Sequence, residues 1–192
     1  MKITTRSPEE TRVLGASLAP TLLPGDVISL SGDLGAGKTL LVQSLGAALG
    51  VQERITSPSF TLLHEYAGRY PIKHLDVYRL DSFQEVLDLG FEELLDPEAV
   101  LVVEWGEAVR PLLPVRYLRV DLHRAATLRD TEREVTFIPY GSDWVRKIRD
   151  MRTTAEALFG AVSPEASPEP RFMESVLPAA REHRGDMREG SG

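Results

Sequence analysis

The residues best suited to chemistry form one glycine-rich run, Gly32–Thr39, which reads Gly-Asp-Leu-Gly-Ala-Gly-Lys-Thr. A glycine, four residues and then Gly-Lys-Thr is the spacing of loops that bind nucleotide phosphates. Glycines let backbone amides close around phosphate oxygens, Lys38 can reach the β- and γ-phosphates, and the Thr39 hydroxyl can ligate Mg²⁺. A strand-like run precedes the loop and a helical pattern follows it. This context favours nucleotide binding over a chance match.

Two carboxylates follow strand-like runs, where a Mg²⁺-binding acid is needed. Glu104 ends the apolar run Val100–Val103, and Asp76 follows Lys73-His74-Leu75. Both assignments depend on an inferred sheet, so the alternative is that these carboxylates end strands on the solvent side. Trp105 is placed to wall a nucleotide pocket, although a tryptophan at a strand end more often serves packing.

The chain contains no asparagine. This excludes the Asn-Lys-x-Asp form of guanine recognition and favours adenine. A small-molecule kinase stays open, because segment 124–133, with Arg124, Arg129 and Arg133, could be taken for an Arg-rich lid. The segment lies between two alternating strands, so a surface hairpin is its simpler interpretation.

The surrounding pattern predicts an α/β, P-loop NTPase-like fold in three layers, with helices flanking a central mixed sheet. Val27–Leu30 predicts a central strand, and Thr39–Leu49 has helical spacing. Residues 118–122 and 134–137 alternate apolar and polar types, as antiparallel strands toward the C-terminus would. The other expected elements are a strand over 1–6, a helix that Ser7 and Glu10 cap, strands near 61–66 and 72–78, a helix over 82–90 that Gly90 closes, and a helical turn over 92–95.

The chain divides into a P-loop domain over residues 1–141, an amphipathic helix over 142–160 and a flexible tail over 161–192. Residues 163–170 are rich in Ser, Pro and Glu and are too polar to form a core. The alternative for the tail is a short docking segment that folds on a partner, made of Phe172, Met173, Val176 and Leu177.

The amino-acid composition excludes several classes of protein and site. The 192 residues include no cysteine, which excludes disulfides and Cys-ligated metals. The net charge of −7 argues against a broadly basic nucleic-acid surface. No apolar run approaches the ~20 residues of a membrane span, and the N-terminus lacks a signal-peptide core. We therefore expect a soluble, cytoplasmic protein without membrane contact.

Four motifs occur in a fixed order: the loop at 32–39, Ser-Pro-Ser-Phe-Thr-Leu at 57–62, His-Leu-Asp-Val-Tyr-Arg-Leu at 74–80 and Val-Glu-Trp at 103–105. Together they resemble the TsaE (YjeE) family of small bacterial P-loop ATPases, over about residues 1–140. The resemblance implies Mg²⁺-dependent ATP hydrolysis, in support of threonylcarbamoyladenosine formation beside the anticodon of certain tRNAs. It implies the partners TsaB and TsaD, with tRNA contacted indirectly through their complex.

The resemblance also implies residue roles. Lys38, Asp76 and Glu104 would be catalytic, with Thr39 and Glu104 holding Mg²⁺. A switch-like loop would comprise Thr56, Ser57, Pro58 and Thr61. The nucleotide-binding set would be Ser7, Asp33, Leu34, Gly35, Ala36, Gly37, Lys38, Thr39, Trp105, Glu107 and Arg133.

One position departs from the family. Many members have a second threonine after the loop threonine, where this chain has Leu40. A hydroxyl role at that position is therefore absent. Besides a partner-activated ATPase, the sequence leaves open a kinase with a small acceptor and a non-catalytic module controlled by nucleotide.

Overall fold

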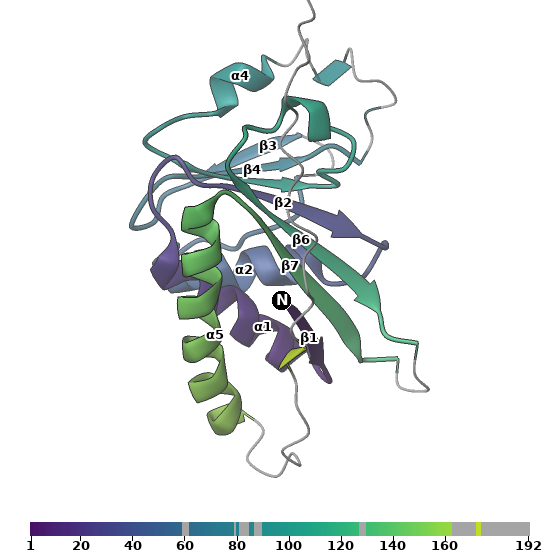
Figure 1. Ribbon diagram of the computed structural model, residues 1–192. Helices are drawn as coiled ribbons and strands as arrows, with labels where there is room; N and C mark the ends of the chain where they lie inside the picture. Colours follow the sequence, from purple (N-terminus) through teal and green to yellow (C-terminus); the bar gives the residue numbers. More distant parts are fainter. Residues whose placement is uncertain are drawn as a thin grey trace, which may run out of the picture.

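The computed structural model describes residues 1–58, 62–78, 80, 85–86, 90–126, 130–162 and 172–173. Figure 1 shows a twisted sheet with helices on both sides. The helices are α1 (Pro8–Leu18), η1 (Ala19–Thr21), α2 (Lys38–Ala48), α4 (Phe91–Leu94), η2 (Arg110–Leu112) and α5 (Ser142–Val162). The strands are β1 (Lys2–Thr5), β2 (Val27–Gly32), β3 (Leu63–Tyr66), β4 (Ile72–Asp76), β5 (Val100–Glu104), β6 (Tyr117–Arg124), β7 (Arg133–Tyr140) and β8 (Phe172–Met173).

Within the described residues these strands form one mixed sheet in the order β3-β4-β5-β2-β6-β7-β1-β8. β4, β5, β2 and β6 run parallel to their neighbours in this series. β3, β7, β1 and β8 join antiparallel. The predicted three-layer fold with a central mixed sheet is therefore confirmed, as is the antiparallel pair toward the C-terminus.

The start of α1 follows the sequence directly. The Ser7 hydroxyl accepts a hydrogen bond from the Glu10 amide at 3.2 Å, and Glu10 Oε2 accepts one from the Arg6 amide at 2.8 Å. The first bond is the N-cap, and the second holds the residue before the cap instead of the N-cap amide of a full capping box. Pro8 lies in the first turn, where a backbone N–H has no partner in the helix. Pro20 lies in the 3₁₀ turn that ends the helix.

Side-chain alternation on β2 separates the two faces of the sheet. Ile28 and Leu30 pack with α1, α2 and α5 on one face, whereas Val27 packs with Phe91 of α4 on the other. Figure 1 shows α1, α2 and α5 gathered on one side of the sheet and α4 on the opposite side. The long helix α5 is tied to the sheet where Lys147 Nζ donates to Asp26 Oδ1 at 2.6 Å, and both side chains are buried.

Several predicted elements lie partly or wholly outside the described residues. Most of the helix expected over 82–90 lies outside them, while Gly90 directly precedes α4 with a φ of 68°. Helix α5 runs to Val162, two residues past the predicted boundary, and β8 pairs with β1 inside the predicted tail. The rest of that tail lies outside the description, so the division into domain, helix and tail stays a prediction. Among the described helices, none has the length and apolar character of a membrane span.

Candidate functional site

Three sequence-predicted features come together because β2, β4 and β5 are parallel neighbours. Their carboxyl ends lie at one edge of the sheet, where ligands bind in open α/β folds. The glycine-rich loop leaves β2 at this edge, and Asp76 and Glu104 are direct register partners at the ends of β4 and β5. Both carboxylates are nearly fully buried. The alternative interpretation, in which Asp76 and Glu104 end their strands on the solvent side, is therefore wrong.

The loop turns sharply between β2 and α2. Gly37 precedes the first helical residue with a φ of 107°, a conformation that side chains rarely permit. At Gly32, where φ is 125°, a Cβ atom would lie only 1.8 Å from the Leu122 carbonyl oxygen. These two positions require glycine, and the turn directs the N-terminal end of α2 at the cavity edge.

Lys38 begins α2 and reaches back across the loop. Its Nζ donates to the carbonyl oxygens of Gly32 at 2.8 Å and Asp33 at 2.9 Å. The ammonium also lies 3.7 Å from the centroid of the Trp105 ring. Burial lowers the pKa of Lys38, and the negative charge of Glu104 opposes that shift. The site thus places one cation among several acidic groups.

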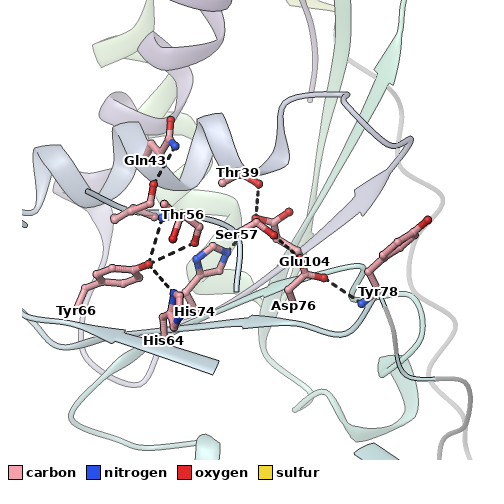
Figure 2. A network of polar contacts seen from close by, with 11 residues as sticks. Thr39, Gln43, Thr56, Ser57, His64, Tyr66, His74, Asp76, Tyr78 and Glu104 are labelled. Carbon is pink, nitrogen blue, oxygen red and sulfur yellow. Dashed lines mark hydrogen bonds and ion pairs between the residues drawn. The ribbon is translucent and has the colours of Figure 1, made fainter. Parts of the chain in front are cut away.

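Glu104 is the centre of the polar network in Figure 2. Its Oε1 accepts a hydrogen bond from the Thr39 hydroxyl at 2.8 Å and contacts His74 Nε2 at 2.9 Å. β5 presents Glu104 to the α2 side of the sheet, because Val102, two residues earlier, packs in the core with α2. Glu104 on β5 thus links Thr39 of α2 to His74 of β4.

Asp76 forms a second polar centre beside the first. Its Oδ2 accepts a hydrogen bond from the Ser57 hydroxyl at 2.6 Å, and its Oδ1 accepts one from the Tyr78 amide at 3.0 Å (Figure 2). Upstream, the backbone N–H of Thr56 donates to the Tyr66 hydroxyl at 3.2 Å, and that hydroxyl donates to the Thr56 carbonyl at 3.3 Å. The segment before Ser57 is therefore fixed to β3.

A cavity of about 300 Å³ opens between these groups. It is lined by Leu34, Gly35, Gly37, Lys38, Thr39, Leu40, Ser57, Asp76, Tyr78, Glu104 and Trp105. Phosphate-binding loop, hydroxyl, lysine and two carboxylates thus face one space, which is the chemistry of a site for a nucleotide phosphate chain.

Residues 5–135 match the model of the family "Threonylcarbamoyl adenosine biosynthesis protein TsaE".

The chain belongs to the TsaE family.

Relatives support this assignment along most of the chain. A tRNA threonylcarbamoyladenosine biosynthesis protein TsaE from Bacillus subtilis is 39% identical over 143 residues, which cover 74% of this chain and 87% of the relative. The TsaE protein of Treponema pallidum is 42% identical over 136 residues, covering 71% and 98%. The crystal structure of Bacillus subtilis YdiB superposes with a TM-score of 0.69 at 34% identity, covering 80% of this chain and 94% of that one.

The structure brings most of the TsaE-based residue set to the cavity, but not all of it. Ser7 caps α1, Glu107 is exposed, and Arg133 donates from Nε to the Ala36 carbonyl at 3.2 Å, which braces the loop from outside. Thr61 and Arg129 lie outside the described residues. The predicted residues that do not line the cavity are Ser7, Asp33, Ala36, Thr56, Pro58, Glu107 and Arg133.

Sequence reasoning missed three residues of this site. Leu40 and Tyr78 line the cavity, and His74 contacts Glu104 from within the sheet. His74 belongs to the TsaE motif at 74–80, and it lies two residues before Asp76 on a strand. Period-two alternation places both on one face of β4, which was the available signal.

The donor set fits Mg²⁺. Magnesium prefers oxygen ligands and is often held by one or two carboxylates, with phosphate and water completing its shell. The described residues contain no group of three or more His, Cys, Asp or Glu that could hold a metal, so an all-protein cage is not what they offer. The Thr39 hydroxyl and the Glu104 carboxylate, 2.8 Å apart beside the phosphate loop, supply the oxygen pair that this mode needs.

Proposed function

We propose that this chain binds ATP with Mg²⁺ and hydrolyses it in the biosynthesis of tRNA threonylcarbamoyladenosine. The observation that carries the proposal is the convergence of Lys38, Thr39, Asp76 and Glu104 on one cavity beside a phosphate-binding loop. Membership of the TsaE family supports the pathway. The absence of asparagine supports adenine over guanine.

The geometry supports a division of roles. Backbone amides of the loop and the N-terminal end of α2 would bind the phosphates, and Lys38 would stabilise negative charge that develops on them. Thr39 and Glu104 would hold Mg²⁺, which neutralises charge on the phosphate oxygens. Asp76 would orient the attacking water, since its carboxylate reaches the same cavity and is itself oriented by Ser57 and the Tyr78 amide.

The proposed partners are TsaB and TsaD homologues, whose complex would bring the tRNA. The chain carries a net charge of −7. Because phosphate contacts dominate tRNA affinity, an acidic chain is better suited to indirect than to direct tRNA contact. We expect slow hydrolysis by the isolated chain and faster hydrolysis when a partner completes the site.

The test measures ATP hydrolysis by the chain alone and with purified TsaB and TsaD homologues, with Lys38→Ala as the control. Stimulation that Lys38→Ala abolishes would support the proposal. Unchanged turnover in the presence of both partners would contradict it. Phosphate transfer that requires an added small acceptor would instead identify a kinase, and tight ATP binding without any turnover would identify a non-catalytic module.

A further inference from the structure

His74 is a buried imidazole with one polar contact among the residues that the structure describes. Its residue is 0% exposed, and its Nε2 lies 2.9 Å from Glu104 Oε1. The ring nitrogen Nδ1 is also buried, and it has no hydrogen-bond partner among the described residues. Leaving a buried polar atom unpaired is unfavourable. The ring therefore needs a role that an apolar side chain of similar size would not fill.

The contact with Glu104 assigns the proton of the ring. A carboxylate oxygen only accepts, so Nε2 carries the hydrogen and donates it to Oε1. Nε2 is therefore the ring nitrogen that faces the carboxylate as a donor, and Nδ1 is the ring nitrogen without a partner among the described residues.

The two contacts to the Glu104 carboxylate end on the same oxygen. Thr39 Oγ1 of α2 and His74 Nε2 of β4 both donate to Oε1. Within the described residues, Oε2 accepts no hydrogen bond. The carboxylate thus has one oxygen held by protein and one oxygen left for a ligand.

We propose that His74 is a positioning residue, which fixes Glu104 through Oε1 so that Oε2 is available to Mg²⁺ in the cavity. This inference rests on the proposed function. Groups that orient a metal ligand typically change metal affinity about 10–100-fold when they are removed. His74 would act in this way without touching substrate or metal.

Histidine-selective ¹⁵N NMR of the wild-type chain tests the hydrogen bond without any nucleotide. The chain has 4 histidines, and loss of one signal in His74→Gln assigns the resonance. We expect the Nε2–H tautomer, with an Nε2 resonance that shifts in Glu104→Ala. An Nδ1–H tautomer, or a resonance that Glu104→Ala leaves in place, would overturn the proposal.

Calorimetric ATP titrations at increasing Mg²⁺ concentration test the consequence. In His74→Leu, we expect half-saturation to need roughly 10–100-fold more Mg²⁺, with unchanged affinity for ATP in EDTA. His74→Gln should stay close to wild type, because the Gln amide can donate from a similar position. His64→Leu, the same change at the register partner of His74 on β3, is the matched control and should also stay close to wild type.

The outcomes separate the two proposals. A Mg²⁺ dependence in His74→Leu equal to that of wild type, or equal losses in His74→Leu and His74→Gln, would overturn the positioning role. A wild-type chain without any Mg²⁺-dependent ATP binding would refute the proposed function and the role of Oε2 with it. The NMR result would still decide whether His74 donates to Glu104.

Discussion

The Lys38 ammonium lies 3.7 Å from the centroid of the Trp105 ring, so the cation of the phosphate loop rests on an aromatic face. A second aromatic ring lies beside Trp105, because the centroid of the Tyr78 ring is 4.8 Å from that of Trp105. Trp105 has a φ of 62°, which is uncommon and strained for a bulky residue. The backbone strain and the cation contact both occur at the cavity, so we predict a role for Trp105 there in addition to its packing.

This contact makes Trp105 a reporter of nucleotide binding. The chain has 2 tryptophans, and Trp144 is fully buried in the core. Phosphates that draw the Lys38 ammonium away from the ring would change the emission of Trp105. We expect Mg²⁺-ATP to change the intrinsic fluorescence of wild type and of Trp144→Phe, and to have no effect on Trp105→Phe. A retained signal in Trp105→Phe would show that the change arises elsewhere.

Asp76→Asn should separate catalysis from binding. The amide keeps the size of the side chain but loses the charge that would orient water, so hydrolysis should fall by roughly 10²–10⁴-fold. ATP affinity should stay near wild type, because in the proposed function the loop and not Asp76 binds the phosphates. Steady-state turnover and equilibrium binding measure the two effects. Ser57→Ala removes only the hydroxyl at 2.6 Å from Oδ2 and should give a smaller loss; full activity in Asp76→Asn would exclude the role.

The sequence contains the strand-loop-helix pattern and the two acids that follow apolar runs. Those signals suffice for the edge of the sheet, because parallel neighbours bring their carboxyl ends together whatever their order. They also suffice for the N-cap at Ser7, where every partner lies within four residues. Local chemistry and alternation therefore predict the fold and the centre of the site.

The missed features depend on contacts between distant segments. The contact of His74 with Glu104 joins residues 30 positions apart, and it exists because β4 and β5 pair in one particular register. The place of Arg133 at the nucleotide stays a prediction, and its Nε donates to the carbonyl of Ala36 in the loop, 97 positions away in the sequence. A motif can indicate that such residues belong together, but rotamer and register decide which atom each one reaches.

Tyr66→Phe should loosen the segment that leads to Ser57. The hydroxyl accepts from the Thr56 amide and donates to the Thr56 carbonyl, so its removal leaves both groups without this partner. We expect faster hydrogen exchange of the Thr56 amide and a loss of about 1 kcal/mol in the free energy of unfolding. Tyr70→Phe is the control, since Tyr70 lies near the same core without a side-chain hydrogen bond in the described residues. Equal exchange rates in both variants would show that the hydroxyl does not restrain the segment.

The stability of the chain should fall as the solution becomes strongly alkaline. Burial and the neighbouring Tyr140 raise the pKa of Tyr117 to about 12, and the two rings stack 4.3 Å apart across β6 and β7. The folded chain therefore keeps the phenol proton between about pH 10, where an unfolded tyrosine loses it, and pH 12. In that window the folded state binds more protons than the unfolded state, so the free energy of unfolding falls as pH rises and is unaffected by this group below pH ~10. Urea denaturation at a series of pH values should show this decline in wild type and a shallower one in Tyr117→Phe. Identical slopes would mean that Tyr117 titrates alike in both states.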